Sequence, residues 1–169
     1  MIAGFSYVTR KVRRELWRDE NLHVACHEAA HAIAHILQFI SFSHAQVGKV
    51  GDSHGRVVGD GKPYWVTDSR IITLMAGPAF DTLVHPKDSF LRIRTLSADG
   101  DYREAVQLVT TGGLVPPWNN GNKYVMEILL RAKKLVRENW DTILKVGRVL
   151  AKRKVMTEEE ILEVATRPE

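Results

Sequence analysis

The longest apolar pattern in the chain covers residues 21–40. This segment contains no glycine or proline and is rich in alanine, the residue with the highest helix propensity. Asp19 and Asn21 lie at its start and are candidate N-caps. Because apolar side chains occur on most sides of the predicted helix, the pattern indicates a central, buried helix rather than a surface helix.

Two shorter patterns flank this helix. Residues 8–18 carry apolar side chains at helical spacing among basic ones, which predicts a short basic amphipathic helix or a lead-in arm. Residues 42–50 and 54–59 alternate between apolar and polar positions and contain β-branched residues, with Gly51-Asp52-Ser53 between them. That pattern predicts a small hairpin or the edge of a sheet, and residues 59–63 are expected to form a turn.

The later patterns are helical. Residues 67–84 predict a second apolar helix, in which Gly77-Pro78 requires either a kink or a division into two helices. A third helix is expected to begin near Asp101. Residues 123–154 predict either one long helix or a broken pair, with Gly147 as the weak point.

The end of the chain completes the expected fold. Thr157 to Glu160 has the sequence of a capping box, which predicts a last short helix that ends near Thr166. We therefore expect a mainly α fold (α+β) with a small β-hairpin beside the long apolar helix. The length suits one folding unit: residues 1–18 form a basic N-terminal arm or short helix, and residues 19–169 form a single domain.

Charge and composition narrow the class of protein. The net charge is +4, and basic residues cluster in Arg10–Arg18 and Lys145–Lys154. Such clusters are usually solvated helix faces, and no RNA-binding aromatic motif accompanies them, so we expect no nucleic-acid partner. Cys26 is the single cysteine and is interpreted as a buried structural thiol. Without a secretory signal or a run of roughly 18–20 apolar residues, we expect a soluble, cytoplasmic protein with no membrane span.

The long helix also carries the motif His27-Glu28-Ala29-Ala30-His31, which has the pattern H-E-x-x-H. Helical residues four apart are rotated by about 40° and separated by a rise of about 6 Å, so both imidazoles can chelate one metal ion. Glu28 lies about 100° from its neighbour, where its carboxylate can reach a water on the metal. Zinc lowers the pKa of such a water to about 7, and Glu28 can pass its proton to a leaving amine. The motif predicts one zinc ion per chain, with Glu28 as the general base.

A catalytic zinc ion needs a third protein ligand and one open position. His35 continues the four-residue spacing but lies about 12 Å along the helix axis from His27, which is too far for one ion. We therefore interpret His35 as a packed histidine. From the residues alone the third ligand stays open among Asp81, Asp99, Asp101 and Glu104, with His44, His54 and His85 as further candidates. Asp101 has an alternative interpretation as a helix N-cap, and Asp81 as an acceptor for a ligand imidazole.

Several motifs, taken in order, resemble the peptidase domain of the FtsH-type ATP-dependent zinc metalloprotease family. The family has H-E-A-G-H-A where this chain has residues 27–32, and an apolar helix with G-G-R-x-A-E where this chain has residues 74–81. It then has T-T-G-A-x-N-D where this chain has residues 95–101. The similarity covers roughly residues 20–165. It implies a helical zinc-peptidase fold, and it implies that Asp101 is the third zinc ligand.

The chain also departs from the family pattern. Ala30 and Pro78 stand where the family has glycine and arginine, and no G-x-x-x-x-G-K-[ST] nucleotide-binding motif occurs. We therefore expect a stand-alone peptidase without the ATPase module, acting on polypeptides alone, with a partner ATPase or as a homo-oligomer. The leading hypothesis is a zinc-dependent metalloendopeptidase. The alternatives are a catalytically weak or inactive zinc-binding regulatory or adaptor module, and a regulatory peptidase that cuts a DNA-binding repressor.

Overall fold

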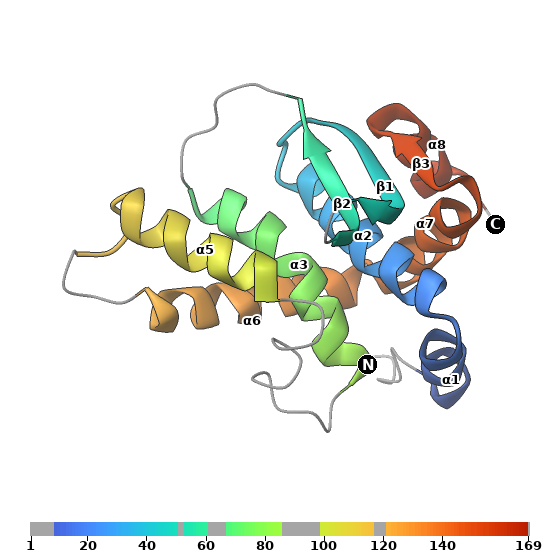
Figure 1. Cartoon of the computed structure of the whole chain (residues 1–169), viewed down its shortest axis with the longest axis horizontal. Helices are drawn as coiled ribbons and strands as arrows, with labels where there is room; N and C mark the ends of the chain where they lie inside the picture. Colours follow the sequence, from blue (N-terminus) through green and yellow to red (C-terminus); the bar gives the residue numbers. More distant parts are fainter. Residues whose placement is uncertain (1–8, 51–52, 61–66, 86–98, 117–120, 169) are drawn as a thin grey trace, which may run out of the picture.

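Helices form most of the chain described by the structure, a computed structural model that covers residues 9–50, 53–60, 67–85, 99–116 and 121–168 (Figure 1). In chain order the elements are α1 (Arg10–Arg18), α2 (Glu20–Leu37), β1 (Phe42–Val50), β2 (Ser53–Gly59), α3 (Asp68–Val84), α5 (Asp99–Thr111), α6 (Asn122–Glu138), α7 (Trp140–Arg153), β3 (Val155–Thr157) and α8 (Glu158–Thr166). The predicted mainly α fold with a small β element is confirmed. The turn predicted over residues 59–63, and the motif predicted over residues 95–101, fall largely outside the described residues.

Helix α2 lies at the centre of the molecule, as its apolar pattern predicts (Figure 1). The carboxylate of Asp19 caps it by accepting a hydrogen bond from the backbone N–H of Leu22 at 2.9 Å. Every residue from Ala25 to His35 is buried. Helices α3 and α7 pack on α2, and strands β1 and β2 contact it as well. The H-E-x-x-H motif therefore lies in a buried stretch of α2.

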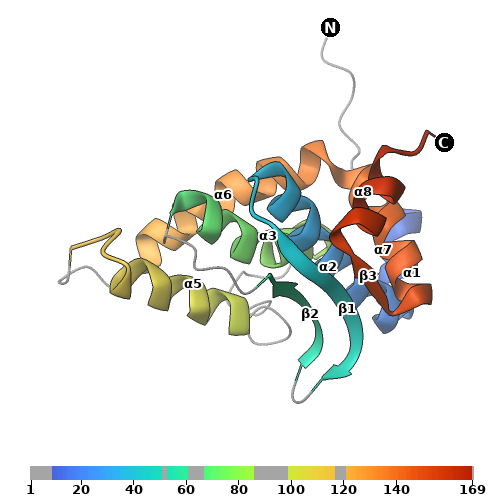
Figure 2. The same ribbon diagram turned by 90° about the horizontal axis from the view of Figure 1, so that it is seen from above.

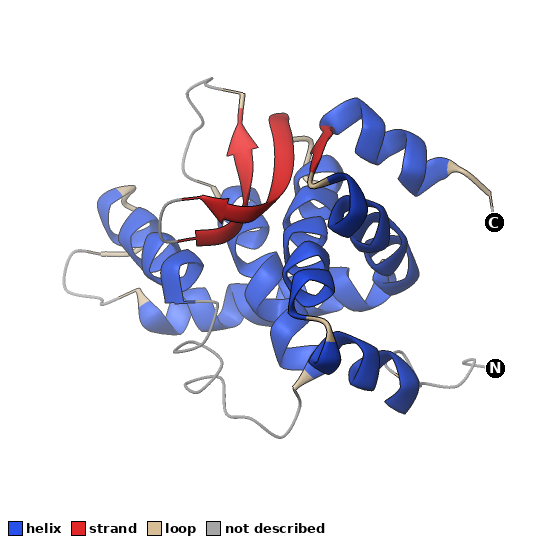
Figure 3. Ribbon diagram, turned by 45° about the vertical axis from the view of Figure 1, so that its right-hand side comes forward, coloured by secondary structure: helices blue, strands red, loops and turns tan. Residues whose placement is uncertain are grey.

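The sheet is antiparallel with strand order β2-β1-β3, and it lies against α2 (Figure 2). In the middle strand, Ala45 is opposite Val57 of β2 and Met156 of β3. The predicted hairpin beside α2 is confirmed. Strand β3 was not predicted, because its three residues are too few to show an alternating pattern. Helix α8 follows β3 directly (Figure 3), and Thr157 and Glu160 form the predicted capping box.

The break in the predicted helix 123–154 falls at Asn139, so the prediction of a weak point at Gly147 is wrong. The break allows Trp140 to pack on Phe80 of α3, with their ring centroids 5.1 Å apart. Gly147 lies inside α7 against Cys26 of α2, where a Cβ would come within 2.5 Å of the Cys26 sulfur. The glycine therefore permits two helices to approach closely. Cys26 is fully buried as expected, and burial raises the pKa of its thiol to about 12.

Gly77 and Pro78 lie inside one continuous helix, so the alternative of two helices is wrong. The hydroxyl of Thr67 caps this helix by accepting a hydrogen bond from the backbone N–H of Arg70. A proline inside a helix removes one backbone hydrogen bond. Packing against α2 on one side and α6 on the other holds α3 together across that position.

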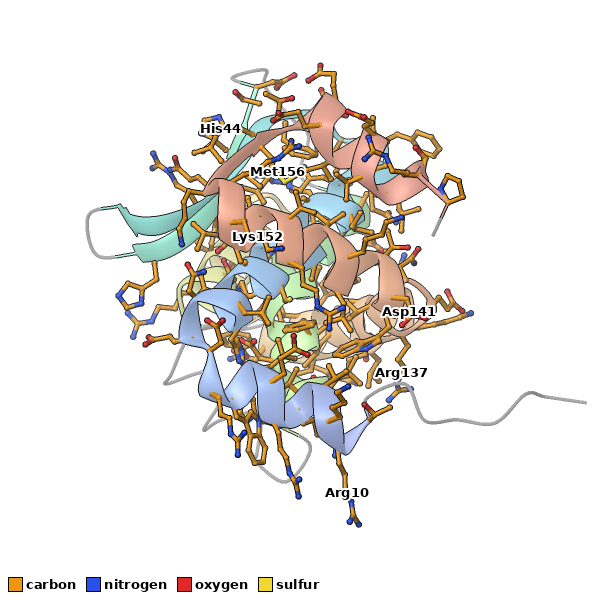
Figure 4. All side chains as sticks on the ribbon, turned by 90° about the vertical axis from the view of Figure 1, so that its right-hand side faces the viewer. Arg10, His44, Arg137, Asp141, Lys152 and Met156 are labelled. Atoms are coloured by element: carbon orange, nitrogen blue, oxygen red, sulfur yellow. The ribbon has the colours of Figure 1, made fainter. Side chains whose placement is uncertain are left out.

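Helix α1 packs on α2 through Leu16, which is 2% exposed, and the α1 residue Glu15 pairs with Arg148 of α7 at 3.1 Å. Its basic side chains are mostly exposed, and Arg10 points away from the body of the molecule (Figure 4). This is the solvated basic face expected from the sequence. None of the helices in the described ranges is both long and apolar enough to cross a lipid bilayer.

Candidate metal centre

Two histidines of α2 and one aspartate of α5 converge on a single point. His27 Nε2 lies 3.1 Å from His31 Nε2. Asp101 Oδ2 lies 3.2 Å from the His27 nitrogen and 3.3 Å from the His31 nitrogen. Within the part of the chain that the structure describes, no other group of three histidine, cysteine or carboxylate side chains brings its donor atoms this close. The four-residue spacing on α2 brings the imidazoles together, and the first turn of α5 adds the carboxylate.

The triangle of donor atoms is close in size to the triangle expected around one zinc ion. Zinc binds imidazole nitrogen and carboxylate oxygen at about 2.0–2.1 Å in a tetrahedral arrangement, which places neighbouring donor atoms about 3.3–3.4 Å apart. The observed separations are 3.1, 3.2 and 3.3 Å. A cavity of about 310 Å³ lies beside the triangle and is lined by Glu28, His31 and Asp101. Three protein ligands with an open fourth position are typical of a catalytic zinc ion.

Gly77 of α3 leaves the space that the ligands need. A Cβ on Gly77 would lie 2.3 Å from Nε2 of both His27 and His31. Real Cβ atoms essentially never come that close to another heavy atom. Glycine at this position therefore keeps the donor nitrogens clear of the helix that passes beside them.

The other nitrogen of each ligand imidazole is fixed by a hydrogen-bond acceptor on α3. His27 Nδ1 lies 3.1 Å from Asp81 Oδ2, and His31 Nδ1 lies 2.6 Å from the carbonyl oxygen of Thr73. A carboxylate and a carbonyl can only accept, so each Nδ1 donates a hydrogen to its partner on α3. Nε2 is then the nitrogen of each ring that would bind a metal ion. The ring nitrogens left for a metal are therefore the two that form the donor triangle.

Charge at the site favours a cation. Burial alone would lower the pKa of His27, but the carboxylates of Asp81 and Asp101 raise it well above its usual range. Burial likewise opposes protonation of His31, whereas Asp101 raises its pKa. Asp81 is 1% exposed, and the hydrogen bonds and charges of His27 and His23 hold its pKa well below the usual range despite burial. Two carboxylates that stay ionised beside the imidazoles concentrate negative charge at the site, which favours a divalent cation.

Glu28 lies beside the triangle without belonging to it. It is 6% exposed and lines the cavity together with His31 and Asp101. Strand β2 passes close to it, since a Cβ on Gly55 would come within 2.7 Å of the Glu28 side chain. Burial raises the pKa of Glu28, against the lowering effect of the two histidines. A carboxylate with a raised pKa beside an open metal position is suited to accept and return a proton.

The other candidates for the third ligand lie elsewhere or have other partners. Asp81 accepts from His27 and is not part of the triangle, and Glu104 pairs with Arg70 at 3.9 Å. The remaining three histidine candidates have these contacts: His44 with Ser43, His54 with Glu20, and His85 with Trp17 and His23. The side chain of Asp99 lies outside the described residues.

His23 and Gly77 belong to the site, but sequence reasoning did not assign them to it. His23 Nε2 lies 2.8 Å from Asp81 Oδ1, so one carboxylate holds two histidines of α2. The sequence contained a pattern that could have identified His23. Histidines at positions 23, 27, 31 and 35 recur at every fourth residue, so they lie along one side of the helix. Gly77 gave no such signal, because only the path of α3 beside the ligands shows why a side chain is excluded.

Comparison with known proteins adds no assignment. No protein-family model matches this sequence, and a search of curated proteins gives no match either. The functional argument is therefore carried by the residues and geometry of the site.

Proposed function

We propose that this protein is a zinc-dependent metallopeptidase that hydrolyses polypeptides, with one zinc ion held by His27, His31 and Asp101 and with Glu28 as the general base. The observation that carries the proposal is the donor triangle, whose edges of 3.1, 3.2 and 3.3 Å match the spacing of zinc ligands. The adjoining cavity supports it, because Glu28 and two of the ligands line the same space.

In this proposal each side chain has a defined task. A zinc ion at this site supplies a water molecule of lowered pKa and polarises the peptide carbonyl. Asp81 and the Thr73 carbonyl keep the ligand imidazoles in one tautomer and orientation. Glu28 takes the proton from the attacking water and delivers it to the nitrogen of the leaving amine. Gly55 of β2 allows the strand to lie against Glu28, which restricts the positions that its carboxylate can adopt.

The alternative is a zinc-binding regulatory or adaptor module without activity. Such a module needs the three ligands but no general base at position 28. Burying a carboxylate costs free energy, and in an inactive module nothing would offset that cost. The burial of Glu28 in the cavity wall therefore favours the peptidase. The proposed substrate is a polypeptide, the proposed setting is cytoplasmic, and a partner ATPase or a second copy of the chain could deliver the substrate.

The decisive experiment replaces Glu28→Gln, which keeps the shape of the side chain and removes its basicity. We expect the variant to retain about one zinc ion per chain by elemental analysis. Its chelator-sensitive cleavage of casein or of a peptide library should fall by about 10²–10⁴-fold, because general base catalysis is lost. Glu127→Gln on the exposed face of α6 is the matched control and should retain full activity. A zinc-loaded Glu28→Gln variant with undiminished activity would contradict the mechanism. A wild-type protein that binds zinc but cleaves nothing would support the regulatory module.

A further inference from the structure

The cavity beside the metal centre extends past the zinc ligands to His35. His35 lies one turn beyond His31 on α2, a rise of about 6 Å, and both side chains line the cavity. Val57 of β2 and Leu74 and Arg70 of α3 form other parts of the wall. The pocket beside the proposed metal centre therefore combines His35 with apolar and charged side chains.

The end of α2 fixes the orientation of the His35 ring. Its Nδ1 lies 3.1 Å from the carbonyl oxygen of Ile40, and the backbone N–H of Ile40 donates to the His35 carbonyl at 3.0 Å. Phe39, with φ of 54°, adopts the left-handed conformation that turns the chain back and makes this exchange possible. The ring also packs edge-on against Phe42 of β1, with centroids 5.4 Å apart. His35 is thus held by its surroundings and does not depend on a ligand for its position.

The hydrogen bond also decides which atom of His35 faces a ligand. A carbonyl oxygen can only accept, so Nδ1 carries the hydrogen. Burial lowers the pKa of His35 to about 4, and the charges of His31 and Arg70 act in the same direction. The ring is therefore neutral at neutral pH, and Nε2 has a lone pair without a hydrogen. Within the described residues Nε2 has no hydrogen-bond partner, although the side chain is 6% exposed.

We propose that His35 forms the base of a substrate side-chain subsite that selects a neutral residue with an N–H or O–H donor (asparagine, glutamine, serine or threonine) next to the scissile bond. The inference rests on the proposed peptidase function. A purely apolar side chain in this pocket has no hydrogen to donate to Nε2. Binding such a side chain would therefore leave Nε2 without a hydrogen bond, which costs binding energy. Lysine and arginine would have to bring a full charge out of water into the pocket, which carries a desolvation cost.

Acidic side chains are the main competitor for this subsite, since Arg70 could attract a carboxylate. The guanidinium of Arg70 already has Glu104 at 3.9 Å, which offsets its charge. A carboxylate also offers Nε2 no hydrogen. The arrangement therefore favours neutral donors over aspartate and glutamate.

The test uses the zinc-loaded protein and pairs of peptides that differ only in the residue next to the scissile bond. Each pair compares side chains of similar shape, threonine with valine or asparagine with leucine. We expect kcat/KM to favour threonine and asparagine by about tenfold, the value of one hydrogen bond to a buried acceptor. His35→Phe should remove the preference while chelator-sensitive cleavage continues, and His44→Phe on β1 is the matched control. The proposed subsite would be overturned by equal rates within each pair or by a preference for acidic residues. An unchanged preference in His35→Phe would overturn it as well.

A second measurement does not depend on the folding of any variant. Nitrogen-15 NMR of the histidine-labelled wild-type protein should show His35 as the neutral tautomer with hydrogen on Nδ1, and a hydrogen on Nε2 would overturn the proposal. The two hypotheses fail differently. Loss of all zinc-dependent cleavage contradicts the proposed function, whereas cleavage without side-chain preference contradicts only the subsite.

Discussion

At the scale of single residues, Gly77 keeps space free beside His27 and His31, the proposed metal ligands. A methyl group at this position would lie 2.3 Å from both donor nitrogens, so Gly77→Ala must displace either the imidazoles or α3. We expect zinc affinity to fall by at least about 100-fold, the upper end of the effect of changing residues that support metal ligands. Competition with a chromophoric chelator measures this directly.

The control for Gly77 is another glycine close to the site in sequence. A Cβ on Gly100 would meet no atom within 4 Å, although Gly100 precedes the ligand Asp101. Gly100→Ala should therefore leave zinc affinity unchanged. If Gly77→Ala were folded and bound zinc as tightly as the wild type, the ligand arrangement described above would have to be abandoned.

The residues of the site differ in how far the sequence could predict them. His27, Glu28 and His31 lie on one helix, and helical geometry alone places them together. Asp101 is 74 residues from His27, so no spacing rule connects them, and the residues left several candidates open. The resemblance favoured Asp101, and the structure brings its carboxylate to the two imidazoles. Whether zinc occupies the site remains a prediction.

At the scale of helices, the contact of α2 with α7 depends on Gly147. A Cβ there would lie 2.5 Å from the Cys26 sulfur and 2.9 Å from the Cys26 Cα, and the backbone atom cannot move aside. Alanine is the better helix former by about 0.8–1.0 kcal/mol, whereas overpacking a core costs about 1–3 kcal/mol. We expect overpacking to dominate, so that Gly147→Ala lowers the free energy of unfolding by up to about 2 kcal/mol in urea titration.

A substitution at an exposed position of α7 serves as the control, because it changes helix propensity without changing the packing of α7 on α2. Lys152→Ala alters an exposed position of α7 and should change stability by no more than about 0.5 kcal/mol. A Gly147→Ala variant that was more stable than the wild type would show that α2 and α7 can separate without cost. In that case helix propensity, rather than close packing, would govern this contact.

The elements that sequence patterns predicted poorly are those decided by distant contacts. The break between α6 and α7 falls at Asn139, where Trp140 reaches Phe80 on α3, and no local signal marks that requirement. Strand β3 exists because Met156 pairs across the sheet with Ala45. By contrast, α2 and the capping box of α8 follow from local chemistry and were predicted correctly.

At the scale of the whole molecule, the proposed metal centre would join helices that otherwise have little contact. Helix α5 packs mainly on α3 and α6, and α2 packs on α3, α7 and the sheet. Asp101 is the residue that links α5 to the histidines of α2. A metal ion bound by all three side chains would therefore stabilise the arrangement of α2 and α5 as well as the local site.

Zinc should therefore raise the thermal stability of the whole protein. An ion that binds only the folded state at 1,000 times its dissociation constant adds about 4.1 kcal/mol. For a chain of this size that amount corresponds to an increase in Tm of about 8–16 °C. Magnesium, which requires octahedral oxygen ligands, should give no comparable shift in a calorimetric scan. Asp101→Asn keeps the size of the side chain but removes its charge, so most of the zinc-dependent shift should disappear. An equal shift in this variant would mean that zinc binds without α5, and the third ligand would have to come from another part of the chain.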